Sequence, residues 1–191
     1  LDEMGMFRIY EDSDPTYILM LKGNADGMEL AGRMGASQLR NLLYAYKERM
    51  DKNRFIQNLL LDNLLLVDIY NQAKKMKIPA EIKRVVFVIE PKNEGDILVQ
   101  ETLKGLYATG TKDFVTAIDE KHIILVKSLQ STDDYPQVEQ IAKELVTTLN
   151  MEAMVSVRAA YGTIVEELKD VSRSYKEADM ALEVGRVFYV E

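Results

Sequence analysis

Residues 155–191 read VSVRAAYGTIVEELKDVSRSYKEADMALEVGRVFYVE, and this stretch decides the fold. An apolar strand is followed by Gly162, which we interpret as a tight turn. Two helical segments come next, the second of which ends near Gly185. Inside the second segment lies the nonapeptide SYKEADMAL, Ser174–Leu182. The order of strand, turn and helices indicates a domain of mixed α and β structure.

Local signals in this stretch predict its finer structure. The hydroxyl groups of Ser172 and Ser174 are expected to cap helices, and Ser174 with Glu177 has the spacing of a capping box. The apolar residues 187–190 are expected to form a closing edge strand. We therefore expect the chain to finish on a sheet edge.

Upstream, β-rich and amphipathic segments alternate. Residues 84–89 begin with Arg84 and are otherwise apolar, a run that is typical of a central strand. The remaining segments are a helix at 96–108, a hairpin of strands at 114–118 and 123–129, a helix opened by Asp133, Asp134 and Pro136, and a strand at 153–158. The order β-α-β-β-α-β predicts an α+β fold of ferredoxin-like, split βαβ type, with an antiparallel sheet and helices over one face.

The first third of the chain has a different pattern. Residues 6–23 predict a β-hairpin with turn residues at 12–15. A lone hairpin is marginal in water, so we interpret residues 1–35 as the end of an upstream domain. Residues 36–78 contain no proline and predict a long connector helix, which if continuous over about 42 residues would span roughly 60 Å. Residues 79–191 would then form the α+β domain.

The connector carries apolar stripes at helical spacing. A helix of this length cannot bury both stripes against one small domain, and long amphipathic helices commonly pair with a copy of themselves. We therefore expect a homodimer through the connector. Asp62 and Asn63 would either lie on a solvated face or fix the register as buried polar residues. The candidate interface residues are Leu39, Leu42, Tyr46, Ile56, Leu59, Leu66 and Ile69.

Composition narrows the classes of function. The 191 residues carry a net charge of −7, which disfavours an extensive nucleic-acid-binding face. The absence of cysteine excludes disulfides and thiol nucleophiles and is compatible with a cytoplasmic location. No apolar run is long enough to span a membrane. The single histidine, His122, has no partner motif and is expected to be structural.

The order of elements, the segment Ser174–Leu182 and the hairpin around Asp119 together resemble the nucleotide-cyclase-like fold of GGDEF domains. More narrowly, residues 82–191 resemble the GGDEF-like domain of PucR/CdaR-type bacterial transcriptional regulators. The resemblance implies a sensor domain upstream and a DNA-binding helix-turn-helix domain downstream, both outside this chain. The connector would then join the sensor to the GGDEF-like domain.

The catalytic positions implied by the resemblance are altered. Active cyclases use acidic residues to hold two divalent metals and glycines where the backbone meets the nucleotide. Here the equivalent positions read Ala117, Ile118, Asp119, Glu120 and Lys121, so both glycines and the phenylalanine are replaced. Glu90 occupies the place expected for the metal-binding aspartate of the first strand. A β-branched isoleucine blocks the close approach that glycine permits.

These observations favour a non-enzymatic signalling and dimerisation segment that needs no cofactor or metal. A ligand bound upstream, whose identity the residues do not reveal, would shift the paired connector helix and so act on the DNA-binding domains. Two alternatives remain open. One is a nucleotide-binding or cyclising enzyme with a degenerate site, and the other is a small-molecule sensor with a pocket in the cyclase-like domain.

Overall fold

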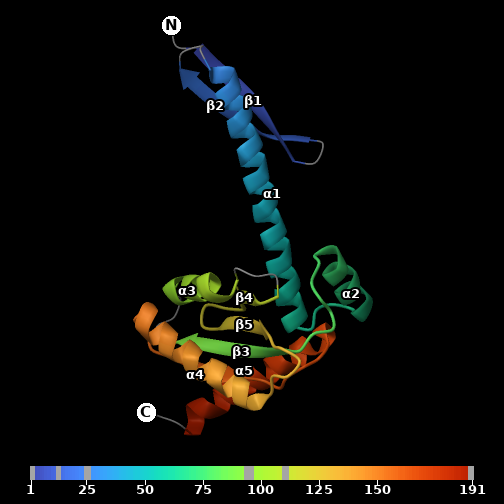
Figure 1. Ribbon diagram of the computed structural model, residues 1–191, viewed down its shortest axis with the longest axis vertical. Helices are drawn as coiled ribbons and strands as arrows, with labels where there is room; N and C mark the ends of the chain where they lie inside the picture. Colours follow the sequence, from blue (N-terminus) through green and yellow to red (C-terminus); the bar gives the residue numbers. More distant parts are fainter. Residues whose placement is uncertain (1–2, 12–13, 24–26, 93–96, 109–111, 189–191) are drawn as a thin grey trace. The chain divides into compact units, whose positions relative to one another are not determined.

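The computed structural model describes residues 3–11, 14–23, 27–92, 97–108 and 112–188. The chain divides into two compact units, Leu1–Lys52 and Asn53–Glu191, and each is considered by itself (Figure 1). Within the described residues, no helix is long and apolar enough to cross a membrane.

The N-terminal unit is a hairpin packed on a helix. Strands β1 (Glu3–Glu11) and β2 (Asp14–Gly23) pair antiparallel, with Phe7 opposite Leu19, which confirms the predicted hairpin. Helix α1 spans Met28–Leu60. The ring of Phe7 lies so close to Gly32 that a Cβ there would come within 2.0 Å of it. Gly32 is therefore a contact site for the hairpin inside α1.

Helix α1 ends at Leu60, so the single connector helix predicted over residues 36–78 is interrupted. Asp62 adopts φ of 61°, its amide donates to the carbonyl of Leu59, and the amide of Asn63 donates to that of Asn58. This is a Schellman motif, in which a residue in the left-handed conformation closes a helix C-terminus. Aspartate tolerates that conformation better than most residues do. Asp62 is thus a helix stop. Asp62 and Asn63 are both exposed, which agrees with the predicted solvated face and excludes the buried, register-fixing role.

A second helix, α2 (Leu66–Lys75), ends in the same way. Lys77 has φ of 57°, its amide donates to the carbonyl of Lys74, and the amide of Ile78 donates to that of Ala73. The connector region therefore consists of two helices, each closed by a Schellman motif.

The C-terminal unit contains a four-stranded antiparallel sheet in the order β4-β5-β3-β6. The strands are β3 (Arg84–Pro91), β4 (Phe114–Ala117), β5 (Ile123–Ser128) and β6 (Val157–Tyr161). Helix α3 (Ile97–Tyr107) follows β3, and α4 (Tyr135–Glu152) follows β5. The predicted split βαβ order and the β4–β5 hairpin are confirmed.

The structure confirms the predicted start of α4, but the strand predicted directly after α4 begins later than expected. Asp134 caps the N-terminus in a capping box with Gln137, as its place before Pro136 indicates. At the other end α4 runs to Glu152 and buries Ala153 at its C-cap. The strand predicted at 153–158 consequently begins only at Val157.

Helices cover both faces of the sheet, so the prediction of one covered face is wrong. Along β3, Val86 and Val88 join an apolar cluster with the end of α1, with α2 and with α5 (Val171–Phe188). Val85, Phe87 and Ile89 join a second cluster with α3 and α4. Because alternate side chains of a strand face opposite sides, the apolar run from Val85 to Ile89 requires two covered faces.

The nonapeptide Ser174–Leu182 lies within α5 where that helix crosses the end of β6. A Cβ on Gly162 would stand 1.9 Å from the carbonyl oxygen of Ser174, so only glycine fits. The Oγ of Ser174 accepts a buried hydrogen bond from the amide of Val86 (3.1 Å). Glu177 accepts from both the amide and the hydroxyl of Thr163. These contacts fasten α5 to β3 and to the segment that follows β6.

This crossing corrects two predictions. Ser174 and Glu177 bond to β3 and to residue 163, so they do not form a capping box. Leu168–Asp170 forms a 3₁₀ turn that leads straight into α5, and α5 continues through Phe188. The edge strand predicted at 187–190 is therefore wrong for Val187 and Phe188, while residues 189 and 190 lie outside the described ranges.

Replacing Gly162 by alanine is expected to lower the free energy of unfolding by roughly 3 kcal/mol, because the added methyl group collides with backbone atoms that cannot rotate away. Gly105→Ala is the matched control. A Cβ at Gly105 meets nothing within 4 Å in α3, so this change should be neutral or stabilise by about 0.5–1 kcal/mol. Urea denaturation of both variants measures the difference. Equal stability of the two would contradict the crossing.

Candidate functional site

The turn of the β4–β5 hairpin is organised by Asp119. Its Oδ1 accepts hydrogen bonds from the amides of Lys121 (2.8 Å) and His122 (2.7 Å), and its Oδ2 lies 2.9 Å from Nδ1 of His122. The amide of Ile118 donates to the carbonyl of His122 across the turn (3.3 Å). Aspartate commonly closes turns through bonds to amides two and three residues ahead. His122 is thus part of the turn, in accord with its predicted structural role.

The pKa of Asp119 reflects this bonding. Desolvation is the largest influence and raises the pKa, but the hydrogen bonds from the His122 ring and from the two amides together outweigh it. The net effect holds the pKa below its ordinary value of 3.8. Asp119 is therefore a bonded carboxylate committed to the turn, without the raised pKa of a general acid.

The two residues before Asp119 face the protein's own helix. The carbonyl of Ala117 accepts a hydrogen bond from Nε2 of Gln57 in α1 (2.8 Å). Ile118 is partly buried against the apolar cluster that contains the end of α1. Glu120 and Lys121 are exposed at the tip. The backbone that glycines would leave open to a ligand is here covered by protein atoms.

Glu90 stands at the same end of the sheet, since Ile89 pairs with Ile123 at the start of β5. Its Oε2 lies 2.6 Å from Nη2 of Arg158, the residue opposite it on β6. The Glu90 side chain is nearly buried, whereas half of Arg158 is exposed. The carboxylate is thus paired with a guanidinium across two strands.

These residues do not fit a two-metal centre. Of the three carboxylates that the sequence singled out, Glu90 is engaged by an arginine and Asp119 by the turn, while Glu120 is exposed at the tip. Among the residues that the structure describes, no group of three or more His, Asp or Glu side chains is arranged to hold a metal ion. A divalent cation here would have to displace the Arg158 pair and dismantle the turn. No metal-dependent step follows from this geometry.

Comparison with known proteins agrees with the fold. Residues 63–184, well over half of the chain, match the GGDEF-like domain family. The chain belongs to this family. No curated protein matches the sequence. One similar solved structure is described as "A Novel Interaction Mode between a Microbial GGDEF Domain and the Bis-(3, 5)-cyclic di-GMP". It shares 14% identity at a TM-score of 0.47, covering 71% of this chain and 87% of that one.

The candidate interface residues do not share one surface. Within the GGDEF-like unit, Ile56, Leu59 and Ile69 are 1%, 2% and 6% exposed and form part of its own core. Leu66 at the start of α2 is exposed. In the N-terminal unit, Leu39, Leu42 and Tyr46 are exposed on α1. Ile56, Leu59 and Ile69 are therefore unavailable for contact with a second copy, because they are already packed in the core of the GGDEF-like unit.

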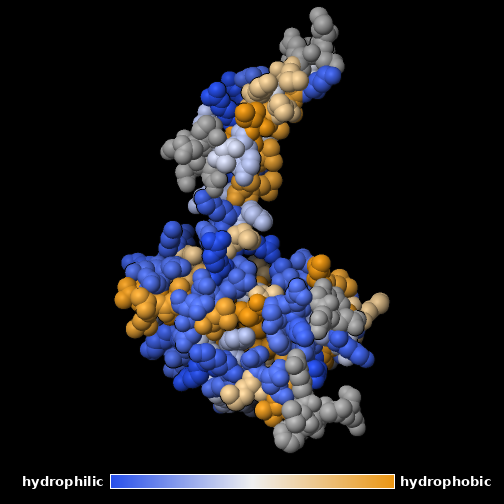
Figure 2. Space-filling view, turned by 180° about the vertical axis from the view of Figure 1, so that it is seen from behind, coloured by the Kyte–Doolittle hydropathy of each residue, from blue (hydrophilic) through white to orange (hydrophobic). Residues whose placement is uncertain are grey.

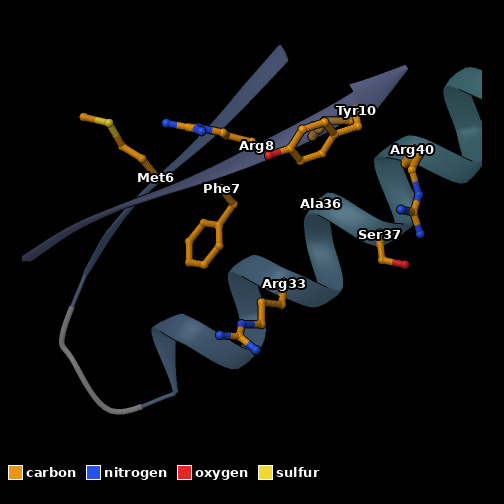
Figure 3. A pocket seen from close by; sticks show the side chains of 9 residues that line it. Met6, Phe7, Arg8, Tyr10, Arg33, Ala36, Ser37 and Arg40 are labelled. Atoms are coloured by element: carbon orange, nitrogen blue, oxygen red, sulfur yellow. The ribbon is translucent and has the colours of Figure 1, made fainter. Parts of the chain in front are cut away.

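A hollow of about 670 Å³ lies in the N-terminal unit (Figure 3). Arg8 of β1 and Arg33 and Arg40 of α1 line it, with Phe7 pointing toward the helix. Arg33 is already paired with Glu29 at 2.7 Å, and the hollow is open to solvent. The small-molecule alternative placed a pocket in the cyclase-like domain, and this hollow belongs to the other unit.

The GGDEF-like domain also contains a buried arginine. Arg84 is fully buried and donates to the carbonyls of Pro79 (2.5 Å) and Ile82 (3.4 Å). Desolvation lowers its pKa to about 10, partly opposed by the charge of Asp113. Its partners are backbone atoms of the loop before β3, so we assign it to holding that loop.

Sequence reasoning missed Gln57 and Arg158 as partners of the hairpin and of Glu90. Gln57 is 60 residues from Ala117 in the chain, and no local spacing links them. Arg158 is a natural cross-strand partner for Glu90, but the pairing of β3 with β6 that brings them together follows only from the topology of the sheet.

Asp119→Asn is expected to cost about 1 kcal/mol of stability near neutral pH, a modest value because half of the side chain is exposed. Since the folded pKa of Asp119 is depressed, its contribution is complete above the unfolded pKa and disappears as pH falls through the folded value. The difference from wild type should therefore shrink below about pH 4. Urea denaturation across pH measures it, with exposed Glu120→Gln as control. A difference that does not change with pH would refute the role of the charge.

Proposed function

We propose that this chain is a non-catalytic signalling and dimerisation segment of a PucR/CdaR-type transcriptional regulator. The observation that supports it best is the hairpin, in which Ala117 and Ile118, at the positions of the two glycines, contact α1 instead of being open to a nucleotide. The resemblance of residues 82–191 to that class of regulator supplies the narrower assignment. In this scheme the protein works in the cytoplasm and binds DNA through a downstream helix-turn-helix domain outside this chain.

Helix α1 supplies the means of dimerisation. Met28, Gly32 and Gly35 adjoin the hairpin at spacings of four and three residues, and Leu39, Leu42 and Tyr46 continue the same spacing. Such a pattern defines one continuous face of a helix. The hairpin covers its beginning, but Leu42 and Tyr46 remain 65% and 64% exposed.

Apolar side chains gather along one side of the N-terminal unit (Figure 2). An exposed stripe of this kind is typical of a helix that pairs with another helix. We assign it to the equivalent stripe of a second copy, which would place two connectors side by side. A shift between the paired helices would then be the signal passed to the GGDEF-like domains.

Light scattering at micromolar concentration is expected to give twice the chain mass of 21.8 kDa. The double variant Leu42→Glu, Tyr46→Glu should weaken dimerisation on the order of a thousandfold. The reason is that two apolar side chains per copy, which the dimer would bury, are replaced by charged ones. Asn41→Glu adds a charge on the opposite side of α1 and should leave the dimer intact. A wild-type monomer would refute this part of the proposal.

Substitution of Leu59 cannot serve this test. Leu59 is buried in the core of the GGDEF-like unit, so a charged residue there would unfold the domain whether or not α1 pairs. Leu42 and Tyr46 avoid this ambiguity because they lie in the exposed stretch of α1.

Incubation with GTP or ATP and Mn²⁺ is expected to yield no cyclic product and no rise in melting temperature. The reason is that Ile118 and Gln57 occupy the approach to the hairpin and that Glu90 is held by Arg158. Chromatography of the products and a melting curve with each nucleotide measure the two outcomes. Detectable product, or clear stabilisation by a nucleotide, would favour the enzymatic alternative.

A further inference from the structure

Strand β4 is an edge of the four-stranded sheet, so among the described residues no strand pairs with one side of it. Backbone groups on such an edge need other partners. Gln57 supplies one by donating from its side-chain amide to the carbonyl of Ala117 at 2.8 Å, in a partly buried position. Gln57 lies one turn before the end of α1. The edge of the sheet is therefore bonded directly to the connector helix.

The next residue reinforces this contact. Ile118 packs against the apolar cluster to which Phe55, Ile56, Leu59 and Leu60 of α1 contribute. The four helix residues are at most 2% exposed. A packed interior does not deform continuously, so displacement of this part of α1 must either carry Ile118 with it or break the contact.

Beyond Ile118 the hairpin is held by the bonds of Asp119 to the amides of Lys121 and His122. The turn is thus rigid internally and is tied to α1 at its base. The other side of the hairpin is held separately, because Ile123 of β5 pairs with Ile89 of β3, so the contact with α1 acts on the β4 side.

We propose that Gln57 and Ile118 form a clamp through which α1 sets the position of the β4–β5 hairpin, and that opening of the clamp is the conformational change received by the GGDEF-like domain. This inference rests on the proposed relay, but the clamp lies within one copy of the chain. Gln57 is accordingly a positioning residue. In the closed state its amide holds the carbonyl of Ala117, and in the open state the hairpin tip is released.

Native-state hydrogen exchange of the whole chain tests the clamp. Gln57→Glu preserves the shape of the side chain but places a carboxylate oxygen against the Ala117 carbonyl. Exchange at the amides of Ile118, Lys121 and His122 should rise about threefold to tenfold, as expected for loss of one hydrogen bond. The amide of Val165, which bonds to Arg84, should be unchanged.

Gln38→Glu is the matched control, since it makes the same chemical change at an exposed position of α1 in the other unit. It should leave exchange at the hairpin unaltered. Equal rates at the hairpin in wild type and Gln57→Glu would overturn the proposal. So would a uniform rise at all amides, because that would show a general loss of stability.

Coupling must also operate in reverse, since linkage between two sites is reciprocal. Asp119→Asn loosens the turn and should therefore speed exchange at the amides of Leu60 and Leu61 at the end of α1. In the double variant with Gln57→Glu the two effects should be less than additive, because either change alone opens the clamp. Full additivity would overturn the coupling.

The outcomes separate this inference from the proposed function. Light scattering reports on the exposed stripe of α1, which none of these clamp variants alters. A dimer whose hairpin ignores Gln57→Glu would refute the clamp alone. A monomer whose hairpin responds to Gln57→Glu would refute the dimeric relay and leave the clamp in place.

Discussion

The close approach of Gly162 to the backbone of Ser174 determines how the last helix of the GGDEF-like domain lies on the sheet. Because Gly162 has no side chain, α5 can pack directly on the end of β6. The Ser174 hydroxyl then reaches the amide of Val86. The same position lets Ala178 and Leu182 enter the apolar cluster. Without this contact, Val86 and Val88 would lose the helix that covers them, and β3 could not remain apolar on both faces.

This crossing explains why the nonapeptide indicates a fold and not an activity. Ser174, Glu177, Ala178 and Leu182 each contact the sheet or the apolar core, and none lies in the β4–β5 turn. The hairpin that would bear the chemistry depends on different residues and can change without affecting the crossing. Replacement of the glycines by Ala117 and Ile118 therefore removes a ligand approach while the fold persists, and the bulk of Ile118 becomes available for packing against α1.

The sequence predicted most elements because β3, α3 and the β4–β5 hairpin have strong local patterns. It failed where the deciding partner is distant or where a helix end depends on backbone conformation. Ser174 has the spacing of a capping residue, but its partner Val86 lies 88 residues away. Asp62 reads as a polar residue in a leucine-rich helix, yet it ends α1 in the left-handed conformation. In the candidate site, the altered motif could be read directly, whereas Gln57 and Arg158 could be found only through the topology.

Helix α1 contributes to two separate packings with different residues. Near Gly32 it adjoins the hairpin of the N-terminal unit, and from Phe55 to Leu60 it enters the GGDEF-like core. Leu42 and Tyr46 belong to neither packing and are 65% and 64% exposed. At about 3.6 residues per turn, Leu42 and Tyr46 continue the side of Gly32, whereas Phe55 to Leu60 are centred on the order of 100° away. The residues proposed to pair with a second copy are therefore distinct from those that build the domain core, so the proposed pairing would take no packing away from the GGDEF-like domain.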